Sequence, residues 1–364
     1  MIETFLTGIR QQVTAQARKD HAPETPYLPI DTQTAASLLQ KSIRRGRTDF
    51  ALKAGRRLFD VQPARLWRRL AVALFEDVGL LDRQLALDLI ACAPKRGFTA
   101  VAWPVVAHLI GRLCVGSKTQ VANNLLHIGR YDFEEATPLE DLDLLSFDEA
   151  ANWIRSDAAT LVQRAKVVWQ LSGVACEGQV IRHPSADRER VMALLSELCD
   201  DPVLEIIARE GVRLTGHVLP LVSVLEQAVT SNPPAYQATI DPMPPEETLS
   251  GVPSWVYDQY TRAGKAALRR ARSECPAIAT ELKRRADTAD QQYLTLADAH
   301  FEFESANLSR RAQIPAHISL LRRVQALGPH RTPDNAEALY EALRAEWRVF
   351  NALRSDAVIS LMEF

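Results

Sequence analysis

The sequence predicts an all-α protein, built as a multi-helix bundle or array. Three observations support this fold class. Ala, Leu and Arg dominate the chain, Gly occurs only 15 times in 364 residues, and runs of Val, Ile and Thr long enough for a strand are nearly absent. Apolar residues (47%) and charged residues (24%) stand in an ordinary globular ratio. A chain of this length can bury two or three helical cores.

Caps and breaks divide the first part of the chain into short helices. Residues 1–30 predict an N-terminal helix and a connector with three prolines. Asp31 or Thr32 caps the next helix and Gly46 ends it. Further start signals are Asp49, Pro63 and Asp82. The predicted helices are 33–46, 49–60, 63–78, 83–93, 99–115 and 117–129, which together indicate a helical domain over residues 31–135.

A proline-rich connector separates the rest of the chain into two parts. Residues 231–254 contain six prolines, so we expect no regular element there. Residues 136–230 before it are a helical extension, and residues 255–364 after it are a C-terminal helical subdomain. The stretch 131–150, at the junction of the first two domains, is an acidic loop or edge. The predicted helices are 148–155, 157–172, 185–199, 201–213, 215–230, 255–273, 276–304, 313–326 and 334–353.

Charge is unevenly distributed although the net charge is only −2. Ten Lys and Arg lie between residues 41 and 69, and eight lie between residues 262 and 285. Residues 131–154 hold eight acidic and no basic side chains. Local asymmetry of this kind is typical of a face that binds a polyanion, and solvated helix faces are an equally good interpretation of any one block.

The chain carries no signal for export or membrane insertion. Its N-terminus, MIETFLTGIRQQ, lacks the apolar run of a signal peptide, and no segment approaches a membrane-spanning length. The five cysteines are odd in number and widely spaced, which favours reduced thiols over disulfides. We therefore expect a cytoplasmic protein without a membrane partner.

Common cofactor and metal motifs are missing. The stretch from Gly111 to Thr119 resembles a phosphate-binding loop, but it has one residue too many before Lys118 and follows an apolar helix instead of a strand. The eight histidines and five cysteines show no metal-ligand spacing, and neither a Gly-x-Ser-x-Gly nor a Gly-x-Gly-x-x-Gly sequence occurs. We expect no cofactor and no metal, which leaves carboxylate, hydroxyl, Lys and Arg chemistry.

One segment concentrates such groups directly after the connector. It reads GVPSWVYDQYTRAGK over residues 251–265. If Ser254 caps a helix, Asp258, Thr261, Arg262 and Lys265 share one face, and Asp258 can pair with Arg262. Glycine inside a helix costs roughly 1 kcal/mol relative to alanine, so Gly264 predicts a close approach by another group. The segment is either a pocket that stacks a base and holds a phosphate, or an ordinary helix start with packed aromatics.

Three patches between residues 30 and 135 carry a family resemblance. They read SLLQKSIRRGRTDFAL (37–52), WRRL (67–70) with EDVGL (76–80), and GSKTQVAN (116–123). Their order and spacing resemble the C-terminal helical region of RarA/MgsA-type clamp-loader-like AAA+ proteins. The resemblance covers less than a third of the chain and implies an oligomerisation collar of DNA-replication proteins, here without the ATPase. It also implies a homo-oligomer, and structural roles for Glu76 and Lys118.

Three functions remain open. The first is a metal- and nucleotide-independent DNA glycosylase that acts on modified bases in defence against phage, with Asp258 as the catalytic carboxylate. The second is a non-catalytic module that binds DNA or oligomerises, and the third is an RNA- or protein-binding helical scaffold. Candidate nucleic-acid-binding residues are Arg262, Lys265, Trp255, Tyr257, Tyr260, Thr261, Lys118, Lys41, Arg44 and Arg45.

Overall fold

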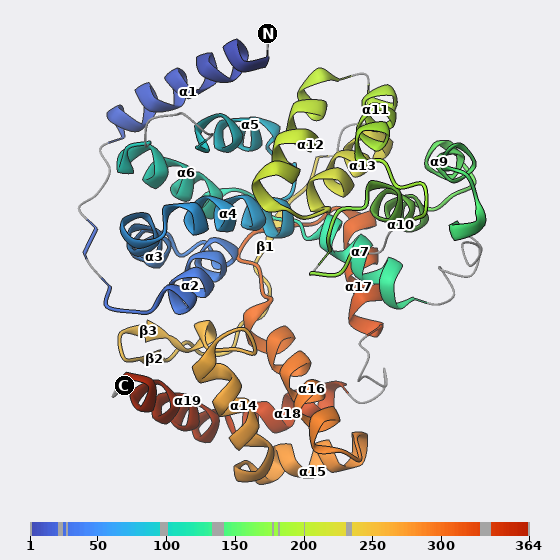
Figure 1. Ribbon diagram of the computed structural model, residues 1–364. Helices are drawn as coiled ribbons and strands as arrows, with labels where there is room; N and C mark the ends of the chain where they lie inside the picture. Colours follow the sequence, from blue (N-terminus) through green and yellow to red (C-terminus); the bar gives the residue numbers. More distant parts are fainter. Residues whose placement is uncertain are drawn as a thin grey trace.

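The computed structural model describes residues 2–20, 25–26, 28–94, 101–132, 142–176, 178–180, 183–199, 201–230, 235–327 and 336–362 (Figure 1). Within these ranges the protein is an all-α multi-helix array, which confirms the predicted fold class. No helix in the described part of the chain is long and apolar enough to cross a membrane. Of the predicted acidic loop or edge over 131–150, residues 133–141 lie outside the described residues; in the rest, residues 142–144 form a 3-10 turn and a helix begins at Phe147.

The N-terminal body contains most of the helices. These are α1 (Ile2–Lys19), α2 (Thr32–Arg45), α3 (Thr48–Val61), α4 (Pro63–Ala73), α5 (Arg83–Cys92), α6 (Trp103–Val115), α7 (Val121–Tyr131), α9 (Phe147–Arg155), α10 (Leu161–Ser172), α11 (Arg188–Cys199), α12 (Pro202–Thr215) and α13 (Leu219–Thr230). A π-helical segment, η1 (Leu74–Val78), continues α4, and a 3-10 turn, η3 (Leu142–Leu144), precedes α9. Helix α17 (Pro315–Ala326) returns from the end of the chain to pack against α7.

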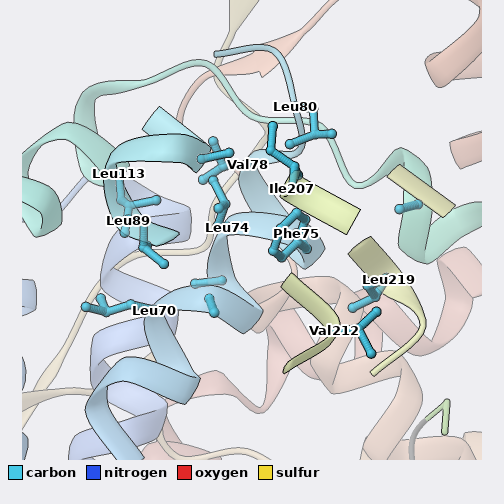
Figure 2. Close-up of a cluster of buried hydrophobic side chains, with 14 of the residues drawn as sticks. Leu70, Leu74, Phe75, Val78, Leu80, Leu89, Leu113, Ile207, Val212 and Leu219 are labelled. Atoms are coloured by element: carbon cyan, nitrogen blue, oxygen red, sulfur yellow. The ribbon is translucent and has the colours of Figure 1, made fainter. Parts of the chain in front are cut away.

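One hydrophobic core runs through this body. Phe75 of η1 is fully buried and lies among side chains of α12 and α13, including Ile207 and Leu219 (Figure 2). Full burial of a side chain of this size stabilises a protein by roughly 1.5–3 kcal/mol. Because α4 packs on α12 and η1 packs on α13, the segments predicted as 31–135 and 136–230 share a single core.

Most helix starts follow the predicted capping logic. The Asp31 carboxylate accepts hydrogen bonds from the N–H groups of Gln33 and Thr34, and Gly46 ends α2 in the left-handed conformation with φ of 68°. Asp82 caps α5. Asp49 does not cap α3, because the preceding Arg47 occupies the N-cap position without a side-chain bond.

The proline-rich connector is more regular than the sequence predicts. Strand β1 (Ala238–Thr239) pairs with β4 (Arg311–Ala312), and β2 (Thr248–Leu249) pairs with β3 (Val252–Pro253). Ser250 and Gly251 join β2 to β3 with positive φ values of 50° and 79°, which suit a tight hairpin turn. The expectation of no regular element was wrong because two-residue ladders need few backbone donors, so they tolerate nearby prolines.

The helices of the C-terminal subdomain lie together at the bottom of Figure 1, and they have their own smaller core. Its elements are the 3-10 turn η4 (Ser254–Val256), α14 (Arg262–Glu274), α15 (Pro276–Arg285), α16 (Ala289–His300), the π-helical segment η5 (Phe301–Ser305), α18 (Ala336–Ala345) and α19 (Trp347–Met362). The single helix predicted over 276–304 is wrong, because a capping box between Thr288 and Gln291 starts a new helix.

Candidate functional site

The segment that the sequence singles out is mainly a loop. Ser254–Val256 form the turn η4, and α14 begins only at Arg262. The hydroxyl of Thr261 accepts a hydrogen bond from the N–H of Gly264 at 3.1 Å, so Thr261 is the N-cap. The prediction that Ser254 caps this helix was wrong, because Thr261 supplies a capping hydroxyl seven residues later.

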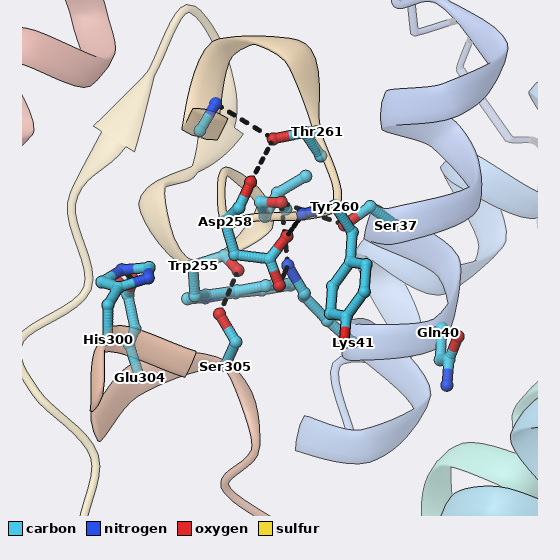
Figure 3. Close-up of polar contacts among 12 residues, drawn as sticks. Ser37, Gln40, Lys41, Trp255, Asp258, Tyr260, Thr261, His300, Glu304 and Ser305 are labelled. Atoms are coloured by element: carbon cyan, nitrogen blue, oxygen red, sulfur yellow. Dashed lines mark hydrogen bonds and ion pairs between the residues drawn. The ribbon is translucent and has the colours of Figure 1, made fainter. Parts of the chain in front are cut away.

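Asp258 lies in this loop, before the helix. Its carboxylate accepts a hydrogen bond from the N–H of Tyr260 at 3.0 Å, and its carbonyl oxygen accepts from the Thr261 hydroxyl at 3.1 Å (Figure 3). The loop is thus closed by the turn chemistry of Asp and Thr side chains. Because Asp258 is outside α14, the predicted helical face and the Asp258–Arg262 pair were both wrong.

The predicted close approach at Gly264 is confirmed, and the approaching group is the loop itself. A Cβ atom on Gly264 would lie 2.0 Å from the carbonyl oxygen of Asp258 and 2.5 Å from its carbonyl carbon and nitrogen. No side chain fits there. Glycine at this position therefore lets the Asp258 loop fold back onto the first turn of α14.

Lys41 of α2 is the counter-charge of Asp258. Its Nζ lies 2.7 Å from the Asp258 carboxylate and donates to the carbonyl oxygen of Val256 at 2.9 Å, and the side chains are 5% and 0% exposed. Ser37 donates to the same carbonyl from one turn earlier. Burial lowers the pKa of Lys41 to about 8, and the charge of Asp258 only partly offsets this. This pair joins the N-terminal body to the loop.

Arg44, one turn further along α2, binds the other side of the same junction. Its guanidinium lies 2.7 Å from Asp77 and 3.2 Å from Glu76, and it donates to the carbonyl oxygen of Ser305 at 2.8 Å. Gln40 donates to Asp77 at 3.0 Å. Burial lowers the pKa of Arg44, but the charges of Asp77 and Glu76 outweigh it and raise the value. Arg44 thus contacts both π-helical segments, η1 through Glu76 and Asp77 and η5 through the Ser305 carbonyl.

Arg45 is the third cation of α2 at this junction, after Lys41 and Arg44. It donates to the carbonyl oxygen of Glu304 and lies over the Trp255 ring, 5.0 Å from its centroid. Burial lowers the pKa of Arg45 to about 10. We call Lys41, Arg44, Arg45 and the charged groups close to them the α2 charge cluster; these groups are Glu76, Asp77, Asp258 and Glu304, with His300 and Arg354 beside Glu304. Its position between the two cores means that several charges must be desolvated when the subdomain docks, which costs stability unless each is paired.

Three members of the cluster, Glu304, His300 and Arg354, were not identified from the sequence. Glu304 lies 3.0 Å from His300 and 2.8 Å from Arg354, and accepts from the Ser254 hydroxyl at 3.0 Å. Burial raises the pKa of Glu304, but Arg354 and His300 outweigh it and hold the pKa well below its usual range. The available signal was the i, i+4 spacing of His300 and Glu304 within an aromatic stretch, which predicts charged groups on a packed face.

Glu76 is the solvent-facing member of the cluster, with 26% of its side chain exposed. Burial and the adjacent Asp77 raise its pKa to about 7, against the lowering effects of Arg44 and Arg69. The groups that face Glu76 are therefore Arg44 from α2, Arg69 from α4 and Asp77 of its own segment, with the amide of Gln40 beside them. A carboxyl group that titrates near neutrality is a functional candidate.

The predicted nucleic-acid-binding residues divide into two groups. The structure brings the residues of α2 and of the loop together although more than 200 positions separate them, but it buries most of them. Buried are Lys41, Arg44, Arg45, Trp255, Tyr257, Thr261 and Lys118. Tyr260, Arg262 and Lys265 are exposed. In this conformation only the second group can contact a macromolecule directly.

Lys118 lies apart from the loop and has a structural environment. Its ammonium donates to the carbonyl oxygens of Cys114 and Gly116, both at 2.8 Å, and its own backbone pairs with the strand residue Arg311. Burial lowers its pKa to about 8. The side chain thus closes the C-terminal end of α6, where carbonyl groups lack partners within the helix.

The exposed side of α14 presents cations at helical spacing. Arg262, Lys265 and Arg269 are exposed at i, i+3 and i+7, while Ala263, Ala267 and their neighbours face the core. Within the described part of the chain, Arg262 and Lys265 form no ion pair. We call Arg262, Lys265 and Arg269 the α14 cationic face.

Tyr260 lies at the end of this face. The residue is 58% exposed, and its ring meets the ring of Phe301 edge-on, with centroids 5.7 Å apart. Gln33 donates to its carbonyl oxygen at 2.9 Å, which fixes the residue beside the start of α2. An anchored, exposed aromatic ring next to unpaired cations is the arrangement that stacks a base near a phosphate chain.

A second polar chain lies in the N-terminal body. The hydroxyl of Thr119 is 2.9 Å from Nδ1 of His317, whose Nε2 is 3.0 Å from Glu226. Hydroxyl, imidazole and carboxylate thus stand in the order of a hydrolytic triad. All three residues are buried, and they tie α17 to α13 and to the start of α7. These hydrogen bonds explain why α17 packs against the N-terminal body.

Comparison of the chain with models of protein families, with curated proteins and with solved structures finds no match. The resemblance of residues 30–135 to the RarA/MgsA-type collar therefore stays a prediction.

Proposed function

We propose that this protein binds DNA and that the α14 cationic face contacts the phosphate backbone. The observation that carries the proposal is the spacing of Arg262, Lys265 and Arg269 on the solvent side of one helix. Two of these cations form no ion pair within the described residues, so a phosphate would not have to displace a carboxylate partner. Phosphate contacts by Lys and Arg supply most of the affinity in sequence-independent binding.

The resemblance to the RarA/MgsA-type collar also supports DNA binding. It suggests a derivative of DNA-replication proteins that binds DNA or oligomerises without catalysis. A homo-oligomer would repeat the α14 cationic face, and repeated faces on one DNA molecule increase the overall affinity. This non-catalytic DNA-binding module is the form of the proposal that the geometry supports best.

Removing two cations of this face tests the proposal. The double variant R262A/K265A is expected to bind a fluorescein-labelled DNA at least tenfold more weakly at low salt, since each lost phosphate contact reduces the counterion release. The matched control is R188A/R209A, which removes two exposed Arg from α11 and α12. Equal affinities of the two variants would contradict a role for α14.

A catalytic form of the proposal is a DNA N-glycosylase that needs neither metal nor nucleotide. The observation in its favour is the pair of Lys41 and Asp258, an amine with a pKa of about 8 against a carboxylate. Asp258 would stabilise an oxocarbenium-like transition state, and the base would have to be flipped out of the duplex. Complete burial of Asp258 requires the loop to open first.

Base release separates the two forms. The protein is incubated in EDTA, without nucleotide, with normal DNA and with DNA carrying modified bases, including phage genomes. Alkali cleavage then reveals abasic sites. The glycosylase predicts cleavage that D258N abolishes while DNA binding persists. The non-catalytic module predicts no cleavage by either protein and salt-sensitive binding by both.

A further inference from the structure

Helix α16 lies beside α14 in the C-terminal subdomain (Figure 1). Just before α14, the Tyr260 ring meets the ring of Phe301, the residue that follows α16. Two turns into α14, the Arg269 guanidinium lies over the ring of Tyr293, in the first half of α16. The two helices are therefore antiparallel neighbours, and an aromatic ring lies at each end of the α14 cationic face. We call Tyr260, Arg262, Lys265, Arg269 and Tyr293 the α14–α16 seam.

Tyr260 offers a stacking surface at the first end of the seam. More than half of the residue is exposed. Its backbone is held on both sides, because its N–H donates to the Asp258 carboxylate and its carbonyl oxygen accepts from Gln33. The ring itself is held by the edge-on contact with Phe301. A ring fixed in this way loses little conformational freedom when a base stacks on it.

The pair of Arg269 and Tyr293 offers a stacking surface at the second end. The guanidinium carbon of Arg269 lies 5.6 Å from the centroid of the half-buried Tyr293 ring. Guanidinium planes stack on unpaired bases as aromatic rings do, and the Tyr293 ring holds this one in place. The exposed cations Arg262 and Lys265 lie between the two ends, and about 10 Å of helix separates Arg262 from Arg269.

We propose that the α14–α16 seam binds single-stranded DNA, with one unpaired base on the Tyr260 ring, a second on the Arg269 guanidinium, and phosphates on Arg262 and Lys265. The inference rests on the proposed DNA binding and names the form of DNA that is bound. Alternation of cations with flat side chains is the arrangement by which proteins bind single strands of any sequence. Stacking needs unpaired bases, because both faces of a base are covered inside a duplex.

Two single-stranded oligomers of equal length test the seam in the full chain at low salt. One is oligo(dT) and the other is abasic, so both carry the same phosphates. We expect the wild type to bind oligo(dT) about tenfold more tightly, an effect of the size of one stacked base. Y260A and Y293A should each lower that ratio several-fold, and Y260F and Y293F should retain it, because stacking depends on the ring. The matched control is F5A, which removes an exposed aromatic ring from α1.

A duplex of the same length separates the role of the rings from that of the cations. Because its bases are covered, Y260A and Y293A should bind it as tightly as the wild type does. The variant R262A/K265A loses phosphate contacts, so it should bind the duplex and the single strand more weakly than the wild type.

The possible results separate two failures. If neither the single strands nor the duplex binds at low salt, the proposed DNA binding itself is wrong. If the wild type binds oligo(dT) and the abasic oligomer equally, or if both tyrosine variants match F5A, DNA binding stands and the single-strand seam is overturned. If Y260A alone lowers the ratio, the assigned role of Arg269 and Tyr293 is overturned, and the reverse result overturns the role of Tyr260.

Discussion

Replacing Asp258 by alanine is expected to destabilise the protein by about 3–5 kcal/mol, because the substitution leaves the buried ammonium of Lys41 without its counter-charge. The loss should be visible as a lower midpoint in urea unfolding, with an unchanged m-value. A destabilisation below about 1 kcal/mol would mean that the pair is exposed in solution, as for a surface ion pair.

A double substitution is the control for this result. In K41M/D258A both charges are gone, so most of the desolvation cost disappears together with the attraction. We expect the double variant to be more stable than D258A alone. If the destabilisations of the single variants K41M and D258A instead add up to that of the double variant, the two side chains stabilise the fold independently. The 2.7 Å contact between them then contributes nothing of its own.

The second large effect is expected at Gly264. The added methyl group of G264A would lie 2.0 Å from the Asp258 carbonyl oxygen, so the loop must move away from α14. Overpacking typically costs 1–3 kcal/mol, and contact with backbone leaves little room for relaxation, so we expect about 3 kcal/mol. Urea unfolding measures the loss.

Gly111 provides the matched control for this substitution. It also lies within a helix, α6. Apart from its chain neighbours and the nearby backbone of that helix, no atom lies within 4 Å of a Cβ added at this position. G111A should therefore stabilise the protein by about 0.5–1 kcal/mol through helix propensity. A neutral G264A would show that the loop is not packed on α14.

Local signals explain how much of the fold was predictable. Asp31, Gly46 and Asp82 act through bonds to residues at most four positions away, and each was identified from the sequence. The helix break near Thr288 was missed, although its capping box is equally local, because the apolar pattern continues across it. Helix α17 could not be placed because its contacts lie in the other part of the chain.

The contacts within the candidate site were less predictable from the sequence than the helices. Composition and position were enough to select Asp258 and its neighbours, and the basic run of α2 was selected separately. That Lys41 binds Asp258 across 217 positions depends on how two cores dock, which no periodicity encodes. For the same reason the cations of α2, predicted at a surface, are buried, since Glu76 and Asp77 of η1, Asp258 of the loop after η4 and Glu304 of η5 lie close to them.

The salt dependence of DNA affinity tests whether the protein binds DNA through phosphate contacts. Anisotropy titrations of the wild type and of R262A/K265A between 50 and 200 mM salt give the slope of log K against log salt. The DNA-binding proposal predicts a steep negative slope for the wild type, and a slope shallower by about 1.4 to 1.8 for the double variant on single- or double-stranded DNA. An affinity that is indifferent to salt in both proteins would contradict a DNA-binding function.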